Sequence, residues 1–442
     1  MRKSIVLLAC GLAAAMPLVP ASAQQAGPSA QPGKFDPRSV VAEVRRVIAE
    51  RYVLPERRPP LDAALAEGLS SGRYTVPDPA VLAERINADL ARVGRDKHLN
   101  IRYDPRQAQI VAAGDNQAAP DSSAYERQVR ARNHGIAELK VLPGNVRYMD
   151  HRGNDWIGSE SQAALNTALQ FLSGGEAVII DLRRNGGGNS QAADYIISHF
   201  LEADTPLVTF HMNGSPSPNI VKTRKELQLP RMVGRPLYVL TSNGTMSAAE
   251  AFAGYVAGHR VGEVVGETTA GGGFRNQLEA IDGGFILSVS VGRAVLASTG
   301  KDWEAVGIAP TIPTPAASAL DVAHGHALRR LASTAPGQER TRLEALADVL
   351  SARHERRATA LPLAAYAGRY GERNIAVEGE RLVYQRGNRP REILIPVGGN
   401  RFVLESDPST IVEFAPSGER AGALLFGLVG GPMQARFERT GE

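Results

Sequence analysis

The sequence predicts an α/β core that follows a helical region and precedes a small antiparallel β unit. Residues 38–93 space their apolar side chains as amphipathic helices do. From Gly135 onward, apolar strands alternate with helical segments, a pattern typical of an α/β layer with a largely buried sheet. After Leu363, short strands recur at even spacing between Gly, Asn and Pro residues, which suits a small barrel or sandwich.

These patterns and the amino-terminal signals divide the 442 residues into six predicted segments. We expect a signal peptide at 1–23, a flexible leader at 24–37, an N-terminal helical domain at 38–105, an α/β core at 125–315, a helical linker at 316–360 and a small β accessory domain at 361–442.

Local composition also predicts individual elements. Gly283-Gly284 marks a hairpin between strands 277–281 and 285–291, and residues 106–123 resemble a loop or linker. The other expected elements are strands at 177–182, 206–212, 237–240 and 261–265, helices at 192–201 and from Ser247, helical spacing at 316–354, and tail strands at 374–377, 382–385, 391–396 and 401–404.

The first residues resemble a secretory signal. Two basic residues begin it, residues 5–18 form an apolar run interrupted by Pro17, and residues 21–23 (Ala-Ser-Ala) form a cleavage site. The run is short, so we expect no membrane span in the mature chain. Cys10, the one cysteine, lies inside it; a lipoprotein site there would have little apolar sequence before it. We expect export to a bacterial periplasm, without disulfides.

Charge and histidine spacing exclude two classes of partner. The chain has 50 basic and 46 acidic residues, and without Arg2 and Lys3 its net charge is about +2. Since no basic stripe with interleaved aromatic residues occurs, nucleic acid is not an expected partner. The nine histidines show no H-E-x-x-H or similar spacing, so we expect no metal and no organic cofactor.

Ser247 stands at a predicted turn between strand 237–240 and an Ala-rich helix. A serine at such a turn exposes its hydroxyl beside a helix N-terminus, whose free N–H groups and positive dipole end stabilise a negative oxygen. This position suits a nucleophile, but it also describes a serine that only caps the helix.

A glycine loop at residues 186–188 follows another predicted strand and precedes a helix, so its backbone N–H groups can face an anion. No Gly-Lys-Ser/Thr follows it, and the G-x-G-x-x-G spacing is absent. Three interpretations stay open: a nucleotide-phosphate loop, a tight turn that needs positive φ, and a loop of oxyanion donors.

Three segments in order resemble one family. Residues 181–188 (DLRRNGGG) resemble the D-x-R-x-N-G-G-G loop of the tail-specific, or carboxyl-terminal processing, serine peptidase superfamily. Residues 241–250 (TSNGTMSAAE) resemble its nucleophile segment, and residues 262–271 (GEVVGETTAG) resemble the strand that follows.

This resemblance implies a fold and a site. It implies a crotonase-like ββα catalytic core over residues 125–315, with Ser247 as the nucleophile. It also implies that the backbone N–H groups of Gly188 and Ala248 form an oxyanion hole.

The base that activates the serine separates the branches of the superfamily. One branch uses a lysine in a Thr-x-Gly-Lys-Gly context, whereas residues 269–273 read TAGGG. The other branch, which includes the tricorn core and the interphotoreceptor retinoid-binding protein repeats, uses a histidine from the N-terminal part. His98, within residues 96–101 (DKHLNI), resembles that histidine in position, so we expect it to be the base.

In that branch a glutamate of a Trp-Glu-x-Val-Gly segment supports the histidine, and Glu304 matches it in residues 303–307 (WEAVG). A serine beside the histidine bridges the two in the tricorn-like arrangement, but Lys97 stands there in this chain. Either Glu304 reaches His98 directly or through water, or another hydroxyl takes the bridging part. The charge of Lys97 is also expected to lower the pKa of His98.

The resemblance therefore implies an exported serine peptidase that acts on a peptide or protein substrate through Ser247, His98 and Glu304. Two alternatives remain: a non-catalytic carrier of apolar ligands such as retinoids or fatty acids, and an esterase for small acyl esters. The tail from Leu363 holds none of these residues, and we expect it to fold as a separate unit.

Overall fold

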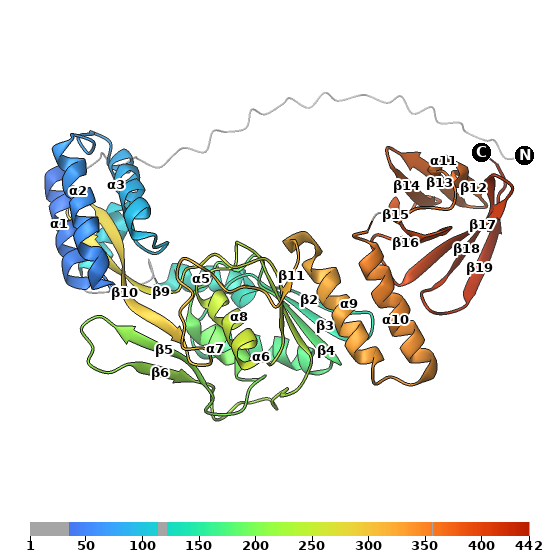
Figure 1. Ribbon diagram of the computed structural model, residues 1–442, viewed down its shortest axis with the longest axis horizontal. Helices are drawn as coiled ribbons and strands as arrows, with labels where there is room; N and C mark the ends of the chain where they lie inside the picture. Colours follow the sequence, from blue (N-terminus) through green and yellow to red (C-terminus); the bar gives the residue numbers. More distant parts are fainter. Residues whose placement is uncertain (1–34, 114–121, 356, 442) are drawn as a thin grey trace, which may run out of the picture. The chain divides into compact units, whose positions relative to one another are not determined.

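The computed structural model describes residues 35–113, 122–355 and 357–441, and Figure 1 shows the order of their helices and strands. The predicted signal peptide, with its cysteine, and most of the predicted leader lie outside these residues. The first helix begins at Pro37, the last residue of the predicted leader.

Three helices form the N-terminal region: α1 (Pro37–Arg51), α2 (Arg58–Ser70) and α3 (Pro79–Gly94), with a short 3-10 turn, η1 (Pro55–Arg57). Each helix has a proline in its first turn, and aspartate carboxylates cap α1 and α3. Their apolar sides share one core with β1 (Asn100–Tyr103) and β10 (Phe285–Leu296). The region is helical as predicted, but it is completed by a strand from far along the chain.

The loop predicted for residues 106–123 is wrong where the structure describes it. Helix α4 (Pro105–Ala112) follows Asp104, whose carboxylate accepts the N–H of Gln107, and α5 (Ser122–Ala131) begins before the segment ends. An aspartate followed by proline is a helix start, and the polar composition of the segment masked it.

The centre of the molecule is a six-stranded sheet with the order β11-β8-β7-β4-β3-β2. All neighbouring strands are parallel except β2 and β3, which are antiparallel. Every residue of β4 and β7 is buried, as expected for parallel strands covered on both faces. The strands are β2 (Ile136–Leu142, after the short turn η2, Asn133–Gly135), β3 (Val146–His151), β4 (Ala177–Asp181), β7 (Leu237–Thr241), β8 (Glu263–Gly266) and β11 (Ile312–Pro313).

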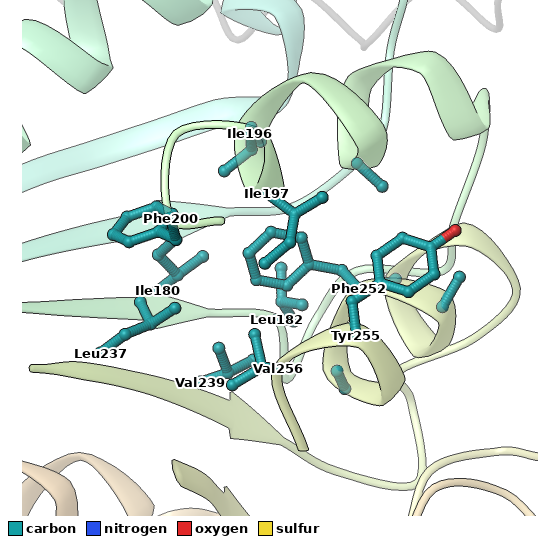
Figure 2. Packing of buried hydrophobic residues seen from close by; sticks show 14 of the residues in the cluster. Ile180, Leu182, Ile196, Ile197, Phe200, Leu237, Val239, Phe252, Tyr255 and Val256 are labelled. Atoms are coloured by element: carbon teal, nitrogen blue, oxygen red, sulfur yellow. The ribbon is translucent and has the colours of Figure 1, made fainter. Parts of the chain in front are cut away.

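Alternate residues of these strands face opposite layers. Val178 and Ile180 pack with helices α6 (Ser159–Ser173), α7 (Ser190–Ile197) and α8 (Ala248–His259). Figure 2 shows side chains of this layer, in which Phe252 of α8 lies among residues of the strands and of α7. Ala177 and Ile179 face α9 (Ala319–Ala332) instead. Burial of each such side chain contributes about 1.5–3 kcal/mol to the stability of the fold. This packing therefore fixes the ends of β4 and β7.

A second, antiparallel sheet contains β1, β10, β5 (Pro206–Met212) and β6 (Asn219–Lys222), and β9 (Phe274–Ile281) also pairs with β10. The β9–β10 hairpin turns at Gly283 and Gly284, which have φ of 76° and 86°, so that prediction is confirmed. The strand predicted at 206–212 is also confirmed. It belongs to this second sheet, because β5 pairs with the far end of β10.

The C-terminal part begins with a short turn, η3 (Ala316–Ser318), and the helices α9 and α10 (Gly337–Ala352), which confirm the helical spacing of 316–354. After α11 (Leu363–Tyr366), eight antiparallel strands follow one another in chain order, and Arg369 in the first bridges Gly441 beyond the last. The sheet thus curves back to its own start, as in a small barrel. Its strands are β12 (Gly368–Tyr370), β13 (Arg373–Glu378), β14 (Arg381–Arg386), β15 (Glu392–Gly398), β16 (Arg401–Leu404), β17 (Thr410–Ser417), β18 (Arg420–Leu428) and β19 (Met433–Glu438).

The predicted class, a mixed α/β core with a helical N-terminal region and a C-terminal antiparallel β unit, is confirmed. Helix α10 also contacts the β unit, because its Leu346 and Leu350 share a core with Val403 and Ile411. Within residues 35–113, 122–355 and 357–441, no helix is long and apolar enough to cross a bilayer.

Candidate active site

Ser247 lies at the turn between β7 and α8, half-buried, with φ 56° and ψ −121°. It is the residue before the helix rather than its first residue, so the helix was predicted to begin one position too early. A non-glycine residue held in such a conformation costs roughly 1–3 kcal/mol, and the surrounding structure must fix it.

The buried carboxylate of Glu250 provides that fixation. Its Oε2 accepts the N–H of Ser247 at 2.8 Å and that of Gly272 at 2.8 Å. Its Oε1 accepts the N–H of Gly271 at 2.6 Å and the hydroxyl of Thr269 at 2.5 Å. One side chain therefore joins the start of α8 to the loop at residues 269–272.

The glycine loop after β4 approaches Ser247 from the other side. Asn185 holds it, because its amide Oδ1 accepts the N–H of Gly187 while its Nδ2 donates to the carbonyl of His151. A Cβ on Gly187 would lie 2.7 Å from the Cβ of Ser247, and φ is 97° there, so this position requires glycine. Among the described residues, the backbone N–H of Gly188 has no recorded acceptor.

Asp181, at the end of β4, has a structural part in the same loop. It forms an ion pair with Arg183 at 2.6 Å and accepts the hydroxyl of Tyr148 at 2.8 Å. Burial raises the pKa of Asp181, but the hydrogen bonds and charge of Arg183 outweigh it and the net pKa is lowered. The carboxylate stays ionised and anchors the loop.

A pocket of about 290 Å³ opens beside Ser247. Gly188 and Ala248 line it together with Ser247, so the structure brings these three predicted site residues to one cavity. The rest of the wall comes from strands of the second sheet, from α8 and from the loops beside them. It is mixed in character: its apolar side chains are Val208, Phe210, Ala251, Tyr255, Phe274, Ala294 and Trp303, and its polar ones are Asn189, Ser190, Arg275 and Asn276.

His98 lies in the turn between α3 and β1, half-buried. The carboxylate of Asp96 accepts the N–H of His98 at 2.8 Å and that of Leu99 at 3.3 Å, which fixes the turn. The ring lies against the pocket wall, because a Cβ on Gly272 would be 3.1 Å from its Cε1. Burial lowers the pKa of His98, and the charges of Asp96 and Glu250 oppose this effect. The imidazole is thus neutral at neutral pH.

Glu304 follows Trp303 of the pocket wall and is buried. Its Oε2 accepts the N–H groups of Gly273 at 2.6 Å and Phe274 at 2.9 Å. Burial, reinforced by the charge of Asp96, raises the pKa of Glu304 to about 7 despite these hydrogen bonds. One oxygen of Glu304, one oxygen of Asp96 and one ring nitrogen of His98 lie within 4.8 Å of one another.

The structure does not join the three predicted catalytic side chains by hydrogen bonds. Within the described part of the chain, no bond is recorded from Ser247 to His98 or from His98 to Glu304. Lys97 is exposed and donates to the carbonyl of Ala270. Burial, and not the charge of Lys97, lowers the pKa of His98, which corrects that expectation.

Two acidic residues of the site were not predicted. Glu250 stands three residues after Ser247, and a serine followed by glutamate at this spacing is the sequence signal of a helix cap. Asp96 has only a weak signal, an aspartate that accepts backbone N–H groups in a turn. With His98 and Glu304, Asp96 forms the one group of described residues whose atoms lie close enough to hold a cation.

Two family models match the chain. Residues 146–314 match peptidase family S41, and residues 36–132 match the N-terminal domain of this peptidase family in eukaryotic interphotoreceptor retinoid-binding protein. The first contains Ser247 and Glu304, and the second contains His98 and Asp96.

Curated relatives are similar over part of the chain. Carboxy-terminal processing protease CtpB of Bacillus subtilis is 30% identical over 230 residues, which cover 51% of this chain and 42% of that protein. A carboxyl-terminal-processing protease of Synechocystis is 31% identical over 120 residues, which cover 27% of each chain. This chain therefore spans less than half the length of either relative.

Solved structures with related folds include a putative peptidase from Parabacteroides merdae, with a TM-score of 0.45 and 19% identity over 64% of this chain and 90% of the other. The photosystem II D1 C-terminal processing protease has a TM-score of 0.41 and 17% identity over 64% of this chain and 94% of the other.

Proposed function

Residues 146–314 belong to peptidase family S41, and from this membership we propose that the protein hydrolyses peptide bonds, with Ser247 as nucleophile and His98 as its base. Glu304 supports the imidazole, and the backbone N–H groups of Gly188 and Ala248 hold the oxyanion. The observation that carries the proposal is the shared pocket of Ser247, Gly188 and Ala248, which the loop at Gly272 connects to the ring of His98.

In this proposal, the Oγ of Ser247 attacks the substrate carbonyl carbon while its proton passes to Nε2 of His98. The imidazolium then gives that proton to the leaving amine, and an acyl-serine ester remains. Water attacks the ester with His98 again as base, and the proton returns to Ser247 as the new carboxyl group leaves. The neutral state of His98 lets it accept the first proton without prior deprotonation.

Ser247→Ala tests the proposal on a chromogenic peptide and a small ester. We expect hydrolysis to fall about 10³-fold or more, with a melting temperature close to that of the unchanged protein. Ser333→Ala is the control, because this serine is exposed at the end of α9 and its hydroxyl donates to the carbonyl of Arg330, one turn back in the same helix. Wild-type turnover by Ser247→Ala would refute the assignment.

The two other functions give different results in the same assays. An esterase would cleave the small ester through Ser247 and leave peptides intact. A carrier would cleave neither and would bind a fluorescent fatty acid tightly, for which the apolar side chains of the pocket wall offer a surface.

We also propose that the chain is exported and cleaved after residue 23, from the basic start, the apolar run and the Ala-Ser-Ala site. The mature protein would then begin at Gln24. Amino-terminal sequencing of protein from the periplasmic fraction of an expressing bacterium tests this, and an intact Met1 in that fraction would contradict it.

A further inference from the structure

Four buried polar atoms beside the pocket lack a hydrogen-bond partner among the described residues. They are the hydroxyl of Tyr52, Oδ2 of Asp96, Nδ1 of His98 and Oε1 of Glu304. Asp96, His98 and Glu304 each contribute an atom to the group that lies within 4.8 Å. Since buried polar atoms in proteins are almost always hydrogen-bonded, four unpaired ones together point to contacts that form when the site works.

Tyr52 belongs to this group through its environment. It follows α1, its side chain is fully buried, and its ring is packed in the core of the helical region. It shares that core with Leu99, three residues after Asp96, and Arg57 of the following turn donates to the carbonyl of Gly94, two residues before Asp96. Burial raises the pKa of Tyr52, and the charges of Asp96 and Glu304 raise it further. The hydroxyl therefore keeps its proton and can only act as a donor toward a carboxylate.

Asp96 is oriented for a second contact. Its Oδ1 is used by the N–H groups of His98 and Leu99, and this leaves Oδ2 for the cluster. The carboxyl group of Glu304 is oriented in the same way, with Oε2 on Gly273 and Phe274 and Oε1 left over. Burial raises the pKa of Glu304, and the nearby charge of Asp96 raises it further.

We propose that Asp96 and Tyr52 are positioning residues for His98: Asp96 Oδ2 accepts the Nδ1–H of the imidazole, and the Tyr52 hydroxyl donates to the same carboxylate and holds it in place where Lys97 leaves no bridging serine. An oxygen of Glu304 lies within 4.8 Å of the Asp96–His98 pair, and Asp96 supplies negative charge beside the ring. This charge stabilises the imidazolium that forms when Ser247 attacks. The inference rests on the proposed function, since it concerns how its base is held.

Other charged groups around the cluster are engaged elsewhere. Glu250 raises the pKa of His98 but is bound by four donors of the loop. Lys97 donates to the carbonyl of Ala270, and Arg57, whose charge lowers the pKa of Tyr52, donates to the carbonyl of Gly94. Asp96 is therefore the carboxylate that both raises the pKa of His98 and keeps an unpaired oxygen for the ring.

The test compares Asp96→Asn and Tyr52→Phe with a matched pair in the same helical region. Tyr74 is also fully buried, and its hydroxyl donates to Asp89 at 2.6 Å. Because this second pair lies among α2 and α3 and outside the pocket wall, Tyr74→Phe and Asp89→Asn control for general destabilisation.

We expect Asp96→Asn to lower kcat roughly 10- to 100-fold, in line with the loss of support for a catalytic histidine, with KM nearly unchanged. The acid limb of its pH–rate profile should move to lower pH, because the charge of Asp96 raises the pKa of His98. Tyr52→Phe should lower kcat about 10-fold, and Asp96→Glu should restore part of the rate lost in Asp96→Asn. The Tyr74 and Asp89 variants should keep the wild-type kcat and pH profile at temperatures where they are folded.

Three results would overturn the inference. Wild-type kcat and pH profile in Asp96→Asn and Tyr52→Phe, while His98→Gln is inactive, would refute it and leave the proposed function intact. Equal losses in the Tyr74 and Asp89 controls would show a structural effect only. Activity that EDTA removes and Zn²⁺ restores would show that the cluster is a cation site. Undiminished activity in His98→Gln would instead refute the proposed function.

Discussion

Glu250→Gln should destabilise the core, because one carboxylate serves four donors. Whichever way the amide is placed, its NH₂ replaces an acceptor. In the orientation that costs less free energy, the NH₂ group faces the N–H of Gly271 and the hydroxyl of Thr269. The N–H groups of Ser247 and Gly272 then still donate to the amide carbonyl oxygen.

The magnitude follows from these contacts. One buried N–H is left unpaired at a cost of about 1–3 kcal/mol, and two charge-assisted bonds become neutral ones of roughly half the strength. We expect a total loss of about 3 kcal/mol, which lowers Tm by roughly 6–12 °C for a domain of this size.

Calorimetry with a parallel activity assay measures both consequences. Turnover should also fall, since the conformation of Ser247 depends on Glu250. Glu176→Gln is the control, because that glutamate is exposed at the edge of the same domain. A Tm within 1 °C of wild type, at unchanged turnover, would refute the idea that Glu250 fixes the turn.

Three further predictions concern other parts of the chain. Burial raises the pKa of Glu304 from 4.5 to about 7. Between these pH values the folded protein therefore binds more protons than the unfolded chain. The contribution of Glu304 to the free energy of unfolding is complete below pH 4.5 and is lost by about pH 7. Glu304→Gln should flatten this decline in urea titrations, and an unchanged pH dependence would contradict it. His98→Gln should abolish hydrolysis while Lys97→Ala only modulates it, and the reverse outcome in steady-state kinetics would make the lysine the base. A chain shortened at Ala360 should keep turnover on a small ester if the tail from Leu363 is a separate unit, and loss of that turnover or of solubility would count against it.

The fold was largely predictable because its signals are local. The strand at 177–181 begins with four apolar residues in a row, and the turn glycines Gly283 and Gly284 mark their hairpin. The helix at 105–112 was missed because its cap signal lies in a polar segment. Strands β17–β19 and the bridge from Arg369 to Gly441 depend on pairings that no short segment encodes.

The site, too, was predictable where local sequence signals mark it and not where distant segments meet. Ser247 and the glycine loop have sequence signals, because a strand-to-helix turn and a close backbone approach each need particular residues. Asp96 reaches Glu304 only through the pairing of β1 with β10, so their proximity could not be predicted from spacing. Lys97 stands where the resemblance expects a bridging serine, and Tyr52, the residue proposed to act there, comes from the end of α1, so spacing along the chain did not point to it.

The most direct test of the account is the site of covalent labelling by a fluorophosphonate, located by mass spectrometry after digestion. The account predicts one adduct, on Ser247, formed far more slowly when His98 is replaced by glutamine. An adduct on another serine, or cleavage of peptides by protein that no probe labels, would contradict it.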